Sequence, residues 1–282
     1  MSTDKTRGGH PTASDAVSRR SALALAGSAA LVTVAAPWVA RAQAKTIRIG
    51  MPTILSGRVA TLGISSRNAV MMEVEKVNAA GGLAGRPIEM VVRDSKGQPQ
   101  EAARVVRELV NTDGCEIIID AEASSAAFAV HEVARDLGML TIHTCSETSQ
   151  LSADPKLRIP NAFRCVRQGV HDSVAGAAYA AKIAKEKGLK KWATCSPDYA
   201  YGRDTTAEFI YYLKQFVPEV EVISESWPKL FQPDYTETIT KLLQANPQAI
   251  YSCIWGGDLT AFIDQGNLYG VFGKAAFFAV NM

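Results

Sequence analysis

The chain has 282 residues, a formal net charge of +2, and a composition that is 47% hydrophobic and 21% charged. A chain of this length can bury a substantial core in one or two domains, and its nearly balanced charge argues against nucleic acids or anionic membranes as partners. Its five cysteines are too sparse for a disulfide framework, and no pair has metal-ligand spacing, although one pair could still oxidise outside the cytoplasm.

The first 44 residues have the features of a twin-arginine export signal. Arg19 and Arg20 precede an apolar run over residues 22–36, and small residues at 42–44 offer a cleavage point before Lys45. The alternative is a membrane anchor, but the apolar run is short for a hydrocarbon core of about 30 Å. The sequence therefore predicts a signal peptide over residues 1–44 and a mature protein that works in the periplasm.

Beyond the signal, short β-rich runs alternate with segments of helical periodicity, which predicts βαβ units in an α/β fold with parallel sheets flanked by helices. The expected strands are 46–52, 88–93, 116–120, 139–143, 192–195, 221–225 and 249–254. The expected helices are 65–78, 99–112, 125–137, 171–186, 204–216 and 235–245. These elements form two successive units of similar size, joined near residues 160–166. We therefore expect two lobes, 45–163 and 164–282, with a cleft between them.

A glycine-rich segment carries the clearest family signature. Residues 78–95 read NAAGGLAGRPIEMVVRDS, in which Gly81 is expected to end a helix and the following glycines to form a turn. Together with the later run DYAYG at 198–202, this segment resembles the periplasmic Leu/Ile/Val-binding proteins, which are substrate-binding components of ABC importers. The resemblance covers the chain from Lys45 and implies a two-lobed type I periplasmic-binding-protein fold. Because members of this family continue further, it also implies that the fold is C-terminally incomplete, with its first lobe unfinished.

Ser124 and Ser125 are the first candidates for a ligand site. They follow an expected strand and open a helix, where serine is a preferred N-cap and free N–H groups can bind an anion. Simple capping would also account for this pair. The resemblance implies more, namely that Ser124 and the neighbouring N–H groups hold the carboxylate of the ligand.

The resemblance implies four further binding residues. Cys145, through its carbonyl, and Glu147, in place of a threonine, are expected to line a pocket for an ammonium group. Tyr201 matches a tyrosine that closes over the ligand, and Trp255 falls near another aromatic position, although a tryptophan is as often part of a core. Weaker candidates are Tyr199 and Asp258.

The chain departs from the family pattern at three positions. Leu62 stands where an aromatic residue is common, Gly169 where an aspartate is expected, and Asn281 roughly where an acid that holds the α-ammonium group would fall. A branched-chain amino acid therefore competes with an aromatic or keto acid as the ligand. The expected function is that of an extracytoplasmic solute-binding protein that delivers a small carboxylate to an ABC permease, with no cofactor, metal or catalytic residue.

Two other classes of protein remain as alternatives. One is a ligand-sensing receptor subunit, and the other is a secreted hydrolase with Cys145 as the nucleophile and His143 or His131 as the base. The hydrolase is the weaker, because alternate residues of a strand are separated by two rises of about 3.3 Å and no third orienting group is evident. A metal site formed by His143, Cys145 and Glu147 would lack a fourth ligand.

Overall fold

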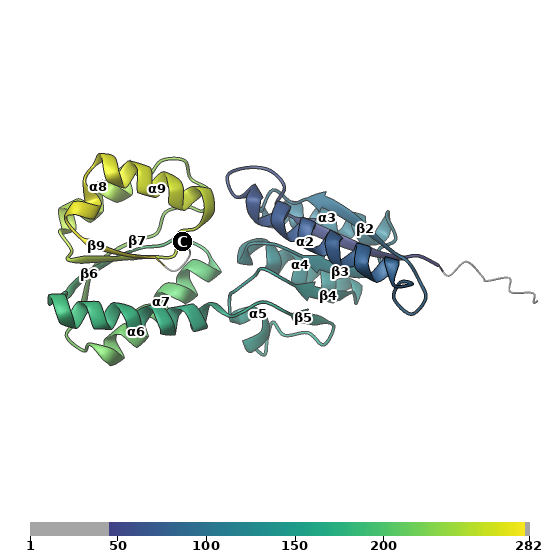
Figure 1. The fold of residues 1–282 in the computed structure, drawn as a ribbon, viewed down its shortest axis with the longest axis horizontal. Coiled ribbons are helices and arrows are strands. Elements are labelled where there is room, and N and C mark those ends of the chain that lie inside the picture. The colour runs from purple at the N-terminus through teal and green to yellow at the C-terminus, as the bar shows by residue number, and fades with distance from the viewer. Residues whose placement is uncertain (1–44, 280–282) are drawn as a thin grey trace, which may run out of the picture. The chain divides into compact units, whose positions relative to one another are not determined.

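Two parallel sheets organise the computed structural model, which describes residues 45–279 (Figure 1). The first sheet has the strand order β2-β1-β3-β4-β5 and the second has the order β7-β6-β8-β9. All pairings between neighbouring strands are parallel, which confirms the predicted fold class. The predicted export signal and Asn281 lie outside the described residues.

The element bounds follow the predicted alternation closely. The strands are β1 (Ile47–Thr53), β2 (Ile88–Asp94), β3 (Ile117–Asp120), β4 (Leu140–His143), β5 (Ala162–Arg164), β6 (Lys191–Cys195), β7 (Glu221–Ser226), β8 (Ala249–Ser252) and β9 (Ala276–Ala279). The helices are α2 (Ala60–Ala79), α3 (Pro99–Asn111), α4 (Ser124–Leu137), α5 (Gln150–Ala153), α6 (Gly169–Lys187), α7 (Ala200–Phe216), α8 (Thr236–Ala245) and α9 (Gly256–Leu268), followed by a 3₁₀ turn at Val271–Gly273.

Local sequence signals account for several of these ends. Helix α3 begins with Pro99, whose fixed φ and missing N–H suit the first turn of a helix. Helix α4 ends before Gly138, which adopts the left-handed conformation that glycine tolerates at a helix end. In the glycine-rich turn, a Cβ on Gly82 would lie 2.2 Å from the Arg86 carbonyl oxygen, so only glycine fits this close approach of the backbone.

The structure differs from the predicted elements in several places. Helix α2 begins at Ala60, five residues before its expected start. The sequence did not reveal this start because Val59, the residue before the helix, has no side chain that could cap it. The segment near residues 160–166, expected to join the lobes, contains the edge strand β5, which is too short to show an alternating pattern. Helix α7 begins at Ala200, four residues before its expected start at 204, and helices α5 and α9 were not predicted.

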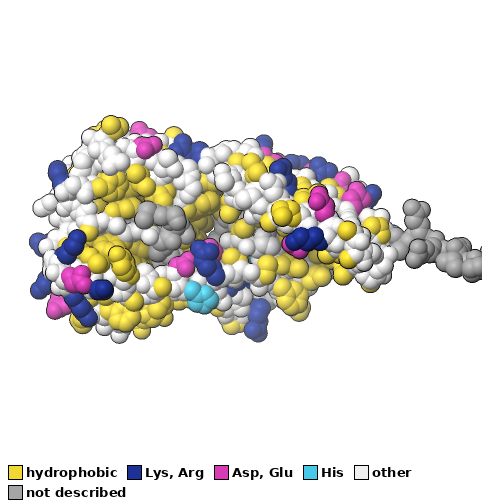
Figure 2. Space-filling view, viewed as in Figure 1, with side chains coloured by type: hydrophobic (Ala, Val, Ile, Leu, Met, Phe, Trp, Pro, Cys, Tyr) yellow, Lys and Arg dark blue, Asp and Glu magenta, His cyan; other side chains and the backbone are white. Residues whose placement is uncertain are grey.

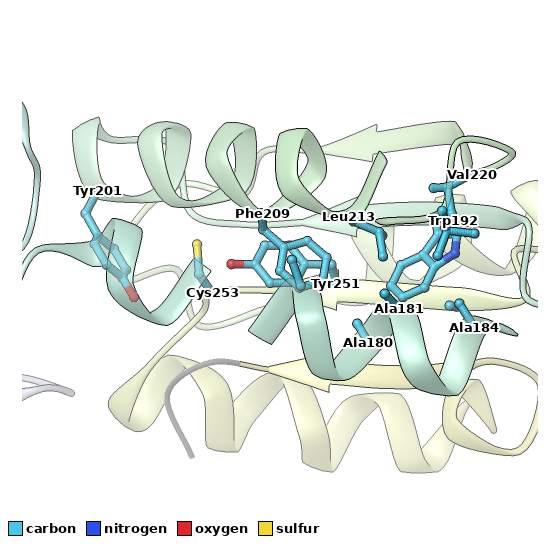
Figure 3. Packing of buried hydrophobic residues seen from close by; sticks show 13 residues of the cluster. Ala180, Ala181, Ala184, Trp192, Tyr201, Phe209, Leu213, Val220, Tyr251 and Cys253 are labelled. Carbon is cyan, nitrogen blue, oxygen red and sulfur yellow. The ribbon is translucent and has the colours of Figure 1, made fainter. Parts of the chain in front are cut away.

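Both faces of the second sheet are covered. Helices α6 and α7 pack on one face around Trp192, Phe209 and Tyr251, and the rings of Phe209 and Tyr251 stack 3.7 Å apart (Figure 3). Helices α8 and α9 pack on the other face around Ile239 and Phe262. Every residue of β8 is buried as a result, which is typical of a central parallel strand.

Three further observations bear on the predicted class of protein. Between residues 45 and 279, no helix combines the length and apolarity needed to cross a bilayer. On the face shown in Figure 2, basic and acidic side chains are interspersed and form no continuous basic patch. All five cysteines are free thiols, so the structure contains no disulfide.

Candidate functional site

A cavity of about 230 Å³ lies at the carboxyl ends of strands from both sheets. Its walls come from helix α2 and from the segments that follow β3, β4, β6 and β8. The carboxyl edge of parallel strands is the usual place for a ligand in an α/β protein. The lining residues are Leu62, Glu122, Ala123, Ser124, Cys145, Glu147, Tyr199, Tyr201, Trp255 and Gly256.

Three helix N-termini meet at this cavity. Helices α4, α7 and α9 follow the N-cap residues Ala123, Tyr199 and Trp255, all of which line the cavity and none of which makes a side-chain capping bond. The first N–H groups of a helix have no acceptor within the helix, and the helix dipole makes this end electropositive. The cavity is therefore suited to an anion such as a carboxylate.

Ser124 lies at the cavity, but its role in the helix differs from the predicted one. The N-cap of α4 is Ala123, which has an extended backbone, and Ser124 is the first helical residue. The Ser124 Oγ accepts a hydrogen bond of 3.2 Å from the Ser146 hydroxyl, so its side chain is directed to the loop after β4 and does not cap the helix. Ser125 is half-buried and is not among the lining residues.

Cys145 lines the cavity with a partly buried thiol. Burial raises the pKa of this thiol, and its sulfur lies 3.4 Å from the Ser66 hydroxyl oxygen. The imidazole of His143 is engaged elsewhere: Nδ1 lies 2.6 Å from a carboxylate oxygen of Asp120, and Nε2 lies 3.1 Å from Nδ1 of His131. Both candidate bases therefore bond to groups other than the thiol, and the arrangement lacks the thiol–imidazole pair that a cysteine hydrolase needs.

Glu147 places a carboxylate at the cavity wall. Its Oε1 lies 3.1 Å from a guanidinium nitrogen of Arg167, whereas its buried Oε2 has no hydrogen-bond partner among the described residues. Burial raises the pKa of this carboxyl, and the nearby Arg167 opposes that shift. The backbone carbonyl of Glu147 accepts a 3.0 Å hydrogen bond from the Gly169 N–H, so the two positions are neighbours in space.

Glu122 is a cavity residue that the sequence did not reveal. Its side chain is fully buried, and neither carboxyl oxygen makes a hydrogen bond of ordinary geometry with the described residues. Burial raises its pKa well above the usual value; the Ser95 hydroxyl opposes that shift, and Asp120 adds to it. A glutamate after a strand is usually a solvated loop residue, and nothing in the local pattern marks this one as buried.

Aromatic side chains form the wall contributed by the second sheet. The Trp255 indole N–H donates a 2.8 Å hydrogen bond to the Tyr199 hydroxyl, which fixes both rings beside the cavity. Tyr201 is 4% exposed, and its ring centroid lies 5.9 Å from that of Tyr199. Figure 3 shows Tyr201 at one end of the buried cluster, with Trp192 at the other end. These rings offer apolar surface together with polar atoms.

A polar contact next to the cavity joins the segments of the two sheets. The Arg58 guanidinium, after β1, donates to the Asp258 carboxylate at 3.2 Å and to the Gly257 carbonyl at 3.1 Å. A Cβ on Gly257 would lie 2.4 Å from the Arg58 carbonyl oxygen, so this approach requires a glycine. Asp258 therefore holds two segments together and does not line the cavity.

The structure thus brings Ser124, Cys145, Glu147, Tyr201 and Trp255 together around one cavity, with Tyr199 beside them. Across residues 45–279, no group of three or more histidine, cysteine or acidic side chains is placed to hold a metal ion. Among the described residues that line the cavity, the charged ones are the two glutamates, Glu122 and Glu147. The cavity therefore combines electropositive helix ends with acidic side chains.

Comparison with known proteins gives a family match over nearly all of the described chain. Residues 46–282 match the family model described as "Periplasmic binding protein". A relative in Brucella abortus (strain 2308), named "Leu/Ile/Val-binding protein homolog 4", is 25% identical over 273 residues. That alignment includes 90% of this chain and 59% of the relative, so the chain spans about three fifths of the relative's length.

Solved structures share the fold. A solute binding protein of an ABC transporter from Rhodopseudomonas palustris BisB5, in complex with 3,4-dihydroxy benzoic acid, has a TM-score of 0.69 and 24% identity, covering 84% of this chain and 61% of that one. A branched-chain amino acid transporter substrate binding protein from Streptococcus pneumoniae, in complex with isoleucine, has a TM-score of 0.69 and 22% identity. The match covers 83% of this chain and 64% of that one. At these identities the likeness is one of fold.

Proposed function

The chain belongs to the periplasmic binding protein family, and from this premise we propose that it is an extracytoplasmic solute-binding protein of an ABC importer. In this proposal a small carboxylate binds in the cavity between the two sheets. The observation that carries it is the meeting of three helix N-termini, without side-chain caps, at one cavity. The first N–H groups of these helices, which have no acceptor within the helix, would replace the water that a carboxylate loses when it is buried.

An amino acid is the first candidate for the ligand. Gly169 stands where the family resemblance implies an aspartate, and a Cβ there would already lie 2.9 Å from the Thr205 hydroxyl oxygen, so a larger side chain would require a shift. Glu147 is hydrogen-bonded to Gly169 through its backbone and brings a carboxylate to the same neighbourhood. This carboxylate would supply the counter-charge for an α-ammonium group in place of the missing acid.

An aromatic carboxylate is the second candidate, and the aromatic wall favours it. Tyr199, Tyr201 and Trp255 together would cover a flat apolar ring. The related protein from Rhodopseudomonas palustris was solved with 3,4-dihydroxy benzoic acid. Both candidates share the carboxylate, and they differ in whether Glu147 has an ammonium group to bind.

Mechanistically, ligand binding would stabilise a closed arrangement that a membrane permease recognises. The contact from Arg58 to Asp258 and Gly257 joins the two halves beside the cavity and would contribute to this closure. The two lobes would follow the predicted division at 163/164, except that the boundary falls after Arg164, because β5 (Ala162–Arg164) pairs with β4 in the first sheet. Export by the twin-arginine route would deliver the protein to the periplasm.

Isothermal titration of the purified protein with matched pairs tests this function. Leucine is compared with leucinamide, and benzoate with benzamide, because each amide lacks only the anionic carboxylate. We expect one acid to bind with a stoichiometry near one and its amide to bind at least about tenfold more weakly, the loss of one charged hydrogen bond. Equal binding of an acid and its amide, or no binding by either acid, would contradict the proposal.

A further inference from the structure

We infer that Glu122 determines which carboxylate binds, by requiring a hydrogen-bond donor on the part of the ligand that lies away from the helix α4 N-terminus. The inference rests on the proposed function, because it concerns a ligand of the same cavity. It applies whether the ligand is an amino acid or an aromatic acid. The ligand class is thus a small carboxylate with an amide, hydroxyl or amine group at its far end.

Glu122 is buried at the cavity wall and lacks ordinary partners. Its side chain has no solvent exposure, lines the cavity, and leaves both carboxyl oxygens without a hydrogen bond of ordinary geometry. Buried polar groups in proteins almost always have partners, and an unpaired one costs about 1–3 kcal/mol. A partner supplied by the ligand would remove this cost, so the unpaired carboxyl indicates a complementary group on the ligand.

The position of Glu122 separates it from the anion-binding end of the cavity. Glu122 precedes Ser124 by two residues, and the extended Ala123 between them allows a Cα separation of up to roughly 7 Å. A ligand whose carboxylate is held at the start of α4 can therefore present a group several bonds away to the Glu122 carboxyl.

Glu122 also acts on a different side of the cavity from Glu147. The groups that shift the pKa of its carboxyl include Asp94, the last residue of β2, and Ser95, which follows it. Glu147 pairs instead with Arg167, which follows β5. Strands β2 and β5 are the opposite edges of the first sheet, so the two glutamates address different parts of a bound ligand.

A donor on the ligand can pair with Glu122 in either ionisation state. An ionised carboxyl has only acceptor oxygens, and a protonated one still keeps an acceptor oxygen beside its O–H. A methyl group in the same place would bury the carboxyl against apolar surface and leave it unpaired. An aliphatic end such as that of leucine should therefore bind less well than a donor-bearing end of the same shape.

Two isosteric pairs of probes test the inference on the parent protein by calorimetry. Asparagine and leucine have side chains of nearly the same shape, and 4-hydroxybenzoate differs from benzoate by one hydroxyl. Within whichever pair binds, we expect the donor-bearing member to bind about tenfold or more tightly. Lysine, compared with norleucine, shows whether a charged donor is accepted as well as a neutral one.

Variants then assign the preference to this side chain. Glu122→Leu should abolish or reverse the preference, whereas Glu122→Gln, which keeps an acceptor oxygen, should retain most of it. Glu208→Gln is the matched control, since this partly buried glutamate bonds to Ser173 and does not line the cavity. Thermal unfolding of each variant confirms that it is folded.

The outcomes separate this inference from the proposed function. Tighter binding of the donor-bearing probe by the parent, lost in Glu122→Leu and kept in the Glu208 control, supports it. Tighter or equal binding of leucine or benzoate by the parent overturns it while the proposed function stands, and this result needs no variant to fold. Binding of none of the probes refutes the proposed function and the inference together.

Discussion

Replacing Ser124 by alanine should weaken carboxylate binding strongly, whereas the same change at Ser125 should not. The Ser124 side chain is 2% exposed, lines the cavity, and accepts a hydrogen bond from Ser146. Because it already accepts, its own O–H is available to donate to a carboxylate. A hydrogen bond to a charged group contributes about 1.5–3 kcal/mol, so the dissociation constant should rise about 10- to 150-fold.

The effect on folding must be separated from the effect on binding. Removing the Ser124 hydroxyl leaves the buried Ser146 hydroxyl without its acceptor, which should lower the free energy of unfolding by about 1 kcal/mol. Loss of a helix cap adds nothing, because Ala123 is the N-cap. Calorimetry with the tighter of leucine and benzoate, alongside urea unfolding of the parent, Ser124→Ala and Ser125→Ala, resolves the two effects. Equal affinities for the parent and Ser124→Ala, or an equal loss in the two variants, would refute the reasoning.

Three further predictions concern charged residues. If Glu147 binds an ammonium group, Glu147→Gln should weaken the binding of leucine about tenfold. The affinity for the keto analogue, 4-methyl-2-oxopentanoate, should be unchanged or improved. Tighter binding of the keto acid than of leucine by the parent would show that Glu147 supplies no counter-charge. Burial raises the pKa of Glu122 above its ordinary value of 4.5, so the folded protein retains this proton at pH values where the unfolded chain has lost it. The parent should therefore lose stability relative to Glu122→Gln as pH rises above 4.5, until the carboxyl ionises in the folded protein. Free energies of unfolding in urea that change in parallel for the two proteins from about pH 5 to 8 would contradict this. Finally, Arg19→Lys combined with Arg20→Lys should block export, because the twin-arginine receptor reads the arginine pair, and an undiminished periplasmic fraction on an immunoblot would argue against that route.

Much of the fold could be predicted from the sequence because the relevant signals are local. The alternation of strand and helix, the turn after Gly81 and the end of α4 at Gly138 depend on residues within one or two turns of each other. Where such signals are weak, prediction failed. Strand β5 has only three residues, and α2 begins after Val59 without a capping side chain.

The site was predictable only in part. Ser124, Cys145 and Glu147 were predicted because each follows a recognisable strand and resembles a family position, and all three line one cavity. Glu122 follows the same strand as Ser124 but escaped notice, because its type is usually solvated and its burial depends on distant chain segments. Asp258 has a charge typical of a binding residue, yet its partner is Arg58.

By itself, the sequence determined the class of fold, the order of its elements and the electropositive helix starts that follow its strands, since these arise from neighbouring residues. The tertiary structure alone decided which helix starts share a cavity and which acids border it. Arg58 and Asp258, 200 residues apart, form an ion pair, and Glu122 is buried at a cavity whose far wall contains Trp255. Parallel strands are joined by crossover connections, so residues that meet at one edge of a sheet come from separate parts of the chain. Local periodicity therefore does not predict which strands become neighbours.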